Sequence, residues 1–409
     1  MTVDESGPLV IPPDIAGELG LKPGVNVPFE MDGDTLRLRR HVTSLARVYV
    51  EPTSRCNLDC STCIRNAWYE PLGDMSANTF QSVMEGLQGF DPVPVVFFGG
   101  FGEPLAHPLI GELVAQAKQL GARVELITNG ILLTENRSQQ LVDAGLDRLW
   151  VSLDGATPES YADVRLAEAL PKILENLVRF RSFALANEGR QTELGVAFVA
   201  LKCNIADLSA LLRLSNQIGA SQYMVTNLLP YTPELCNETL YGLALGKDSQ
   251  KYSPFSPKIN LPRIDWNDAT RLPLYSLMRT YENISIEGER LNRTANRCHF
   301  IARGVTVIAW DGMVSPSLAL MHSYSSYLDE RKRYSLRYTL GNISQRSLKE
   351  IWEDPNYVDF RQRVQEFNFS PCSCCGGCDL AERNEEDCFG NTFPTCGGCL
   401  WAQGVIQCP

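Results

Sequence analysis

From Arg47 onward the chain alternates short apolar runs with stretches in which apolar residues recur every three or four positions. Six apolar runs occur, and they begin near residues 47, 94, 123, 147, 193 and 222. Runs that are almost continuous in apolar residues and separated by amphipathic helices indicate parallel strands whose outer face is covered. The pattern therefore predicts an α/β fold, either an open barrel or a doubly wound sheet.

The stretch PLIGELVAQAKQLG illustrates the helical pattern. Its apolar residues fall on one face of a helix that Gly121 ends, namely Leu109, Ile110, Leu113, Val114, Ala117 and Leu120. In both candidate folds, the loops after the carboxyl ends of the strands hold the functional site. The residues that carry chemistry are therefore expected in these loops.

The flanking segments follow other patterns. Residues 8–40 predict a strand, a short helix, a turn and two strands joined by a DG turn. This piece resembles the AbrB-like swapped-hairpin module of small dimeric DNA-binding regulators. The expected division is 1–42 for this module, 43–235 for the α/β core, 236–295 for a connector or insertion and 296–409 for a cysteine-rich domain.

Composition narrows the class of protein. The chain has 409 residues, 44% apolar and 21% charged, which is typical of globular proteins of two or three domains. A net charge of -11 disfavours broad binding to nucleic acid or anionic lipid, so we expect the N-terminal module to pair with a second copy or dock on the core. The N-terminus lacks the pattern of a signal peptide and no apolar run is long enough for a membrane span, which predicts a cytoplasmic protein without membrane contact.

The 14 cysteines indicate metal ligation rather than disulfides, because the chain is large and shows no export signal. Cys56, Cys60 and Cys63 stand at C-x3-C-x2-C spacing just after the first apolar run. A structural zinc takes four ligands, so three thiolates indicate either a distant fourth ligand or an iron-sulfur cluster that keeps one iron open.

This spacing, in this fold, resembles the radical S-adenosylmethionine (SAM) superfamily. The resemblance implies a 4Fe-4S cluster held by Cys56, Cys60 and Cys63, whose open iron binds the amino and carboxylate groups of SAM. Reduction then splits SAM into methionine and a 5'-deoxyadenosyl radical. The family usually has an aromatic residue before the third cysteine, where this chain has Thr62.

Later strand ends match further motifs of that superfamily. FFGGFGEP resembles its glycine-rich motif, and WVSLDG and YADVR resemble segments that contact the ribose and carboxylate of SAM. A solvated helix residue is the alternative for the arginine of YADVR, although a guanidinium suits a carboxylate well. The SAM-binding residues that the resemblance implies are Gly99, Gly100, Glu103, Ser152, Asp154 and Arg165.

The second group of cysteines resembles the SPASM extension of radical SAM maturases, which carries one or two auxiliary iron-sulfur clusters. Pairs at C-x2-C spacing can bring two sulfurs to one metal centre, and a zinc ribbon remains the alternative. The chain departs from the family pattern, with Ser317 in place of a cysteine and Leu318 in place of a catalytic aspartate. The expected ligands are Cys298, Cys372, Cys375, Cys378, Cys388, Cys396, Cys399 and Cys408.

Over nearly its whole length the chain looks similar to the radical SAM maturases associated with tungsten-containing aldehyde ferredoxin oxidoreductases. The resemblance implies a protein, peptide or pterin-cofactor substrate and an electron donor such as ferredoxin or flavodoxin. A maturase that modifies a ribosomal peptide is the first alternative. A DNA-binding regulator stabilised by metal is an alternative of another class, which the acidic composition and the SAM motifs disfavour.

Overall fold

The computed structural model describes residues 2–3, 9–21, 24, 27, 29–32, 35–157, 164–187, 192–242, 245, 259–262, 264–265, 267–280, 284–286, 289–290, 296–328, 330–373, 375 and 378–409. Its largest sheet has nine strands in the order β10-β9-β8-β7-β6-β5-β14-β15-β18. None of the described helices is long and apolar enough to cross a membrane.

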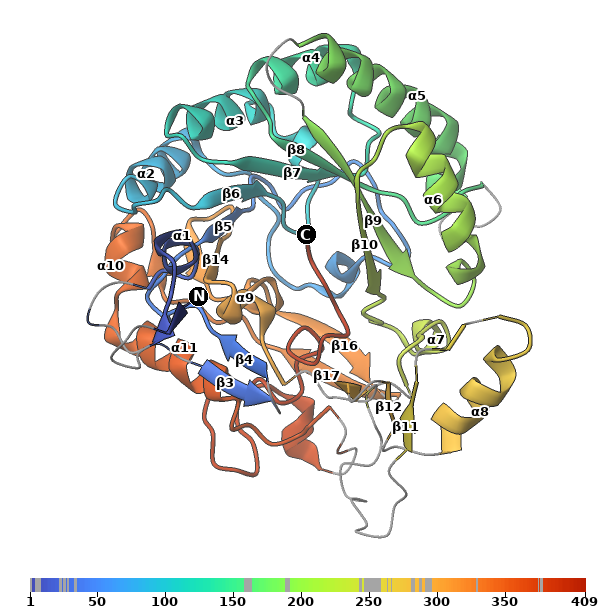
Figure 1. Ribbon diagram of the computed structural model, residues 1–409. Coiled ribbons are helices and arrows are strands. Elements are labelled where there is room, and N and C mark those ends of the chain that lie inside the picture. Colours follow the sequence, from blue (N-terminus) through green and yellow to red (C-terminus); the bar gives the residue numbers. More distant parts are fainter. Residues whose placement is uncertain are drawn as a thin grey trace.

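Six parallel strands form the core of this sheet. They are β5 (Arg47–Val50), β6 (Val95–Phe98), β7 (Val124–Thr128), β8 (Arg148–Ser152), β9 (Glu193–Ala200) and β10 (Gln222–Asn227). Each strand pairs in parallel with the next one in sequence, and the strands curve into an arc (Figure 1). A doubly wound sheet reverses its strand order partway, so this order identifies the open barrel. The six predicted strands are confirmed.

Helices cover the outer side of the arc (Figure 1). They are α2 (Ala77–Leu87), α3 (Ile110–Gln119), α4 (Glu135–Asp143), α5 (Val164–Ala186) and α6 (Leu208–Gln217). The helix predicted around residue 114 is α3, and Gly121 has the positive φ of +80° that favours glycine after a helix. Leu109, which the pattern places on the buried face, is 36% exposed because it precedes the first turn of α3.

The cysteine-rich region continues the barrel sheet. Strand β14 (Val305–Ile308) pairs in parallel with β5, and β15 (Met313–Ser315) returns antiparallel to it before pairing with β18 (Gly341–Asn342). The stretch GVTVIAWDGMVSPS predicts a strand pair, and the pairing of β14 with β15 confirms it. The other elements here are α9 (His299–Ala302), β16 (Tyr324–Leu328), β17 (Arg331–Ser335), α10 (Leu348–Trp352) and α11 (Pro355–Glu366).

The pattern of SLKEIWEDPNYVDFRQRVQEF predicts one helix, but the structure has two helices there, α10 and α11, so this prediction is wrong. Pro355 cannot continue α10, because its ring blocks the helical hydrogen bond and restricts the preceding residue. Asp354 instead begins a new helix, with its side chain accepting from the Asn356 N–H at 3.0 Å.

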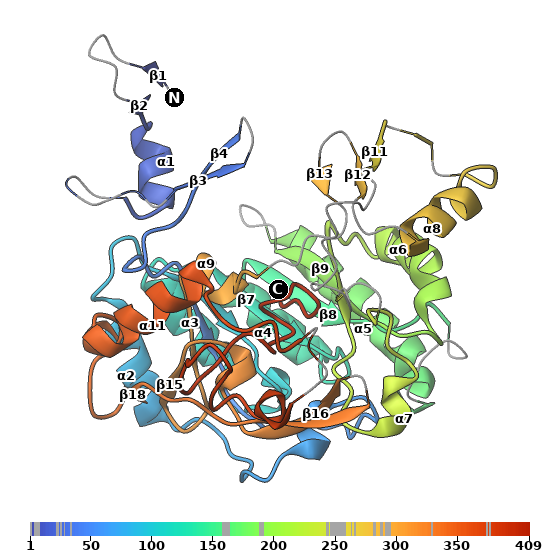
Figure 2. The same ribbon diagram turned by 90° about the horizontal axis from the view of Figure 1, so that it is seen from below.

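The remaining elements lie outside the barrel (Figure 2). The N-terminal part contains β1 (Thr2–Val3), β2 (Leu9–Val10), α1 (Pro13–Glu18) and the hairpin of β3 (Phe29–Asp32) and β4 (Thr35–Leu38). This order matches the predicted strand, helix and hairpin, whereas the DG turn itself lies outside the described residues. The connector contains α7 (Pro233–Cys236), β11 (Ile259–Leu261), α8 (Arg271–Thr280), β12 (Ile284–Ile286) and β13 (Glu289–Arg290).

The last residues of the chain lie within the arc of the barrel (Figure 1). The Arg47 guanidinium of β5 donates to the Pro409 carbonyl at 2.9 Å, and the Asn227 amide of β10 donates to the Val405 carbonyl at 2.9 Å. The segment therefore spans from the first to the last barrel strand.

Candidate active site

The cysteine loop, residues 51–63, follows β5 and leads into the short 3-10 helix η1 (Ile64–Ala67). The Cys63 N–H donates to the Cys60 carbonyl at 3.1 Å, so these two cysteines share one tight turn. The hydroxyl of Tyr231, in the loop after β10, donates to the Ser61 carbonyl at 2.5 Å. The loops after the first and last barrel strands thus meet beside the cysteines.

Arg65 lies within electrostatic reach of all three loop cysteines. The Arg65 guanidinium donates to the Leu58 carbonyl at 2.9 Å. Burial lowers the pKa of Arg65, but Cys63, Cys56 and Cys60 all raise it, and the net direction is upward. Burial raises the pKa of Cys56. All three cysteines are partly exposed, and three thiols on one loop fit a cluster that takes three thiolates and keeps one iron open.

The glycine-rich loop, residues 99–103, lies against the cysteine loop. The Gly99 N–H donates to the Val50 carbonyl at 3.0 Å. A Cβ at Gly100 would lie 2.7 Å from the Cγ of Glu51, and one at Gly102 would lie 2.1 Å from the Thr53 carbonyl oxygen. Only glycine permits this approach at Gly100 and Gly102. Gly99 and Gly100 directly follow β6, so they lie at the carboxyl end of a barrel strand, where the sequence predicts them.

Glu103 is 2% exposed and joins this loop to the end of β7. It accepts hydrogen bonds from the Leu105 N–H at 2.9 Å, the Thr128 hydroxyl at 2.8 Å and the Asn129 N–H at 2.7 Å. Burial raises the pKa of Glu103 to about 7 despite these donors. The Asn129 side chain lies 3.8 Å from the sulfur of Cys56, so Glu103 orders backbone next to the cysteines.

The other residues predicted to bind SAM lie farther along the arc. Ser152 ends β8, and Asp154 follows it and accepts from the Val199 N–H of β9 at 3.0 Å. Desolvation raises the pKa of Asp154 to about 6, although this hydrogen bond lowers it. Arg165 lies in the first turn of α5, but its side chain is outside the described part of the structure.

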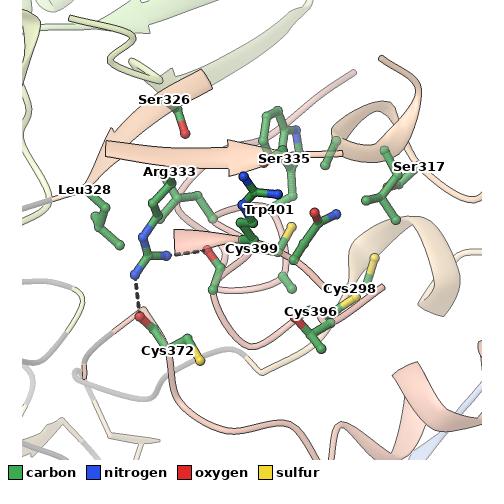
Figure 3. Close-up of a pocket in the computed structure, with 18 of the residues that line it drawn as sticks. Cys298, Ser317, Ser326, Leu328, Arg333, Ser335, Cys372, Cys396, Cys399 and Trp401 are labelled. Carbon is green, nitrogen blue, oxygen red and sulfur yellow. Dashed lines mark hydrogen bonds between the residues drawn. The ribbon is translucent and has the colours of Figure 1, made fainter. Parts of the chain in front are cut away.

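The C-terminal cysteines form a buried and an exposed set. The inner cysteines, Cys298, Cys396 and Cys399, line a cavity of about 70 Å3 together with Cys372 and Ser317 (Figure 3). Burial raises the pKa of Cys298 to about 12, and neighbouring Cys399 raises it further. Arg333 closes the cavity by donating to the Cys372 carbonyl at 2.5 Å.

The outer cysteines, Cys375, Cys378 and Cys388, are exposed, and Cys372 lies within electrostatic reach of Cys388. Cys408 is separate: it accepts from the Trp401 indole N–H at 3.4 Å and raises the pKa of Tyr49 in β5. Buried and clustered thiols fit iron-sulfur ligation, which draws the proton from each sulfur. Within the described ranges, no three His, Cys, Asp or Glu side chains are close enough for a single metal ion.

Sequence reasoning missed a buried ionisable network at the barrel mouth. His322 lies between Glu51 and Glu70, with Nε2 2.9 Å from Glu51 Oε2 and Nδ1 2.8 Å from Glu70 Oε2. A glutamate directly after a strand was a usable signal for Glu51. No spacing or motif marks His322, because it reaches the site from 271 residues away.

The fold and the cysteines define an enzyme of the radical SAM superfamily. Residues 50–187 match the radical SAM superfamily, and residues 298–379 match the SPASM iron-sulfur cluster-binding domain. The chain belongs to the radical SAM enzymes that carry a SPASM domain. Its cofactors are SAM, the SAM-binding 4Fe-4S cluster and auxiliary iron-sulfur clusters.

Among individual proteins, the chain is similar to the tungsten-containing aldehyde ferredoxin oxidoreductase cofactor-modifying protein of Pyrococcus furiosus. The two are 30% identical over 371 residues, which cover 88% of this chain and 96% of that protein. It is also 24% identical over 399 residues to the Fe-coproporphyrin III synthase of Methanosarcina barkeri, covering 91% and 93% of the two chains.

A solved structure shares the fold. Streptococcus suis SuiB bound to S-adenosylmethionine matches with a TM-score of 0.52 and 17% identity, over 82% of this chain and 71% of that one. At this identity the likeness concerns the fold alone. It agrees with a partial barrel followed by a cysteine-rich domain.

Proposed function

We propose that this radical SAM enzyme matures a tungsten-containing aldehyde ferredoxin oxidoreductase or its pterin-based cofactor. The observation that carries the proposal is the similarity to the Pyrococcus furiosus cofactor-modifying protein, which covers 88% of this chain. The match to the radical SAM superfamily covers only residues 50–187, so the likeness extends well beyond the barrel.

In this proposal Cys56, Cys60 and Cys63 hold the SAM-binding cluster. When bound, the reduced cluster supplies the electron that splits SAM into methionine and a 5'-deoxyadenosyl radical. Arg65 offsets the negative charge of the three thiolates, since all three raise the pKa of its guanidinium. The glycine-rich loop offers backbone to the amino end of SAM through Gly99 and Gly100.

Glu103, Ser152, Asp154 and Arg165 complete the proposed SAM site. Glu103 accepts the Asn129 N–H at 2.7 Å and thereby holds Asn129 beside Cys56. Asp154 accepts the Val199 N–H with one carboxylate oxygen, and its second carboxylate oxygen suits a ribose hydroxyl. A guanidinium at Arg165 suits the SAM carboxylate.

We propose that the C-terminal cysteines bind two auxiliary clusters. The inner cysteines share one buried cavity, which favours a cluster shielded from water. Cys372 and the outer cysteines supply four thiolates for a second cluster nearer the surface, and Cys408 stays available to the inner one. A ferredoxin or flavodoxin would supply electrons, in a cytoplasm reducing enough to keep these thiols unpaired.

The N-terminal module, proposed to resemble the AbrB-like swapped hairpin, carries an apolar face. Phe29 pairs with Leu38 and Met31 with Leu36, and Phe29 and Met31 are 63% and 59% exposed. A two-stranded hairpin is seldom stable alone in water. We propose that a second copy of the chain covers this face, and sedimentation of wild type and Met31→Lys tests it: the variant should be monomeric.

The test of the main proposal needs an oxidoreductase made in a host without this enzyme. Anaerobic incubation with SAM, a reductant and this enzyme should yield 5'-deoxyadenosine and a mass change in the extracted pterin cofactor. The same incubation with Cys60→Ala should yield neither. Formation of 5'-deoxyadenosine with no change in the oxidoreductase or its cofactor would redirect the search to a peptide substrate.

A further inference from the structure

His322 is almost completely buried between two carboxylates from distant parts of the chain. Its side chain is 1% exposed, and that of Glu51 is 0% exposed. Both ring nitrogens lie within 2.9 Å of carboxylate oxygens, and an ionised carboxylate only accepts hydrogen bonds. Both nitrogens must therefore carry a proton, so the geometry holds His322 as an imidazolium.

Glu51 connects this imidazolium to the glycine-rich loop. Its Oε1 accepts the Phe101 N–H at 3.3 Å, and its Oε2 accepts the Trp310 N–H at 3.4 Å. The side chain also packs under Gly100, where a Cβ would lie 2.7 Å from its Cγ. The orientation of one carboxylate thus sets the backbone of the glycine-rich loop against the turn between β14 and β15.

Glu70 and Trp68 connect the same imidazolium to the chain that leaves the cysteine loop. Glu70 Oε1 accepts the Ser323 N–H at 2.7 Å. The Trp68 ring stacks on His322 with centroids 4.2 Å apart and planes at 29°, and Phe101 meets Trp68 edge-on at 5.3 Å. Backbone pairing of Trp68 with Tyr324 of β16 fixes this contact.

We infer that His322 is a positioning residue that locks the SPASM domain, the exit of the cysteine loop and the SAM-facing glycine-rich loop into one arrangement. The inference rests on the proposed role of Gly99 and Gly100 in binding SAM. His322 reaches the loop backbone through Glu51, which accepts the Phe101 N–H, so its role is to position that backbone. Its loss should therefore weaken SAM binding rather than change the chemical step.

The charges around the network agree with this role. Two carboxylates face His322, and Arg337 lies 3.7 Å from Glu70 while binding Asp311 at 2.9 Å. Burial lowers the pKa of His322, but its hydrogen bonds to Glu51 and Glu70 outweigh burial and raise the pKa to about 9. The imidazolium is therefore the resting form at neutral pH.

The test compares wild type, His322→Gln and Arg361→Gln. Glutamine is neutral and carries both of its donors on one nitrogen, so it cannot replace donors at two separate ring positions. Arg361 is buried in the SPASM domain, where it donates to the Val42 carbonyl at 2.7 Å and stacks on Trp352. Its loss should destabilise the protein at a site remote from the glycine-rich loop, which makes it the control for a general loss of stability. Amide hydrogen exchange on the reconstituted protein without SAM should be faster in peptides covering residues 99–102 and 309–311 of His322→Gln, and unchanged there in Arg361→Gln.

The second measurement is the SAM dependence of 5'-deoxyadenosine formation. We expect the KM for SAM to rise about ten-fold in His322→Gln, with kcat within about two-fold of wild type. Unchanged exchange of the two peptides, or an unchanged KM, would overturn the inference.

If the wild-type protein formed no 5'-deoxyadenosine, the proposed function would be refuted instead. The exchange result would still report whether His322 couples the two peptides. Should His322→Gln not fold, Glu70→Gln serves in its place. The Glu70 side chain is 20% exposed, so this variant should show the same changes with a smaller amplitude.

Discussion

The two groups of cysteines are assembled in different ways. Cys56, Cys60 and Cys63 lie within one loop, so local spacing alone keeps them in one part of the fold. The inner cysteines come from the start of α9 and from a turn about a hundred residues later, so only the tertiary fold unites them. The loop group also has a cation, Arg65, within electrostatic reach, whereas the inner group is buried among apolar residues.

This contrast suggests a division of labour. Three partly exposed thiols beside a guanidinium suit a cluster that must admit a charged small molecule. The pKa of Cys396 is raised by burial and then by Cys399 and Cys298, which indicates a site where thiolates are costly unless a metal centre neutralises them. The inner site therefore suits a buried electron carrier.

The largest expected effect comes from removing one loop cysteine. Cys60→Ala should lower 5'-deoxyadenosine formation by about a thousand-fold or more, because the cluster that reduces SAM loses a ligand. The C-terminal iron should remain, since no inner or outer cysteine depends on this loop. Iron analysis and chromatography of the products check both points. Equal loss of all iron would break the proposed independence of the two groups.

A substitution in the inner group sharpens the comparison. Cys399→Ala should remove about four iron atoms per chain and abolish substrate turnover. SAM cleavage without substrate should stay within about three-fold of wild type, because the loop cluster is intact. Cys388→Ala, at an exposed position, serves as the partner variant and should lose the outer cluster while the chain keeps its thermal stability. Loss of SAM cleavage in Cys399→Ala would contradict the division of labour.

Two glycines test the same contrast through packing. A Cβ at Gly102 would lie 2.1 Å from the Thr53 carbonyl oxygen, and one at Gly397 would lie 1.8 Å from the Ser370 carbonyl oxygen. Gly102→Ala should reduce SAM cleavage about a hundred-fold and leave the C-terminal iron content normal. Gly397→Ala should lower the C-terminal iron content and leave SAM cleavage near that of wild type.

The control for both is Gly242→Ala, where a new Cβ would meet nothing within 4 Å. This variant should match wild type in iron content and SAM cleavage. If Gly102→Ala instead lowered the C-terminal iron as much as Gly397→Ala did, the two sites would have to share their packing.

Much of the barrel was predictable because its signals are local. The apolar runs identified six strands, and Cys56, Cys60 and Cys63 fall at the strand end where parallel sheets place their sites. The pairing of β14 with β5 was not predictable, since these strands are about 250 residues apart and nothing in either marks the other. A parallel partner is selected by tertiary packing rather than by a turn.

The candidate site divides along the same line. Its cysteines and glycines were recognisable from spacing, whereas the buried ion network was not, because it joins Glu51 to His322 from another domain. The break between α10 and α11 was visible as Asp354-Pro355, so that error came from giving periodicity more weight than a proline.

The smallest expected effect concerns pH and the coupling of the two domains. Since the folded pKa of His322 is raised to about 9 from its ordinary 6.5, its contribution to stability is complete below about pH 6.5 and is lost as pH rises through about 9. The contribution is on the order of 3 kcal/mol at most. Denaturant unfolding of wild type and His322→Gln, both without metal and with reductant, should show a gap that is largest near pH 6.5 and closes by about pH 10. The cysteines titrate in both proteins and cancel in the difference. A gap that stays constant across this range would mean that His322 holds the domains together by packing against Trp68 and not by its charge.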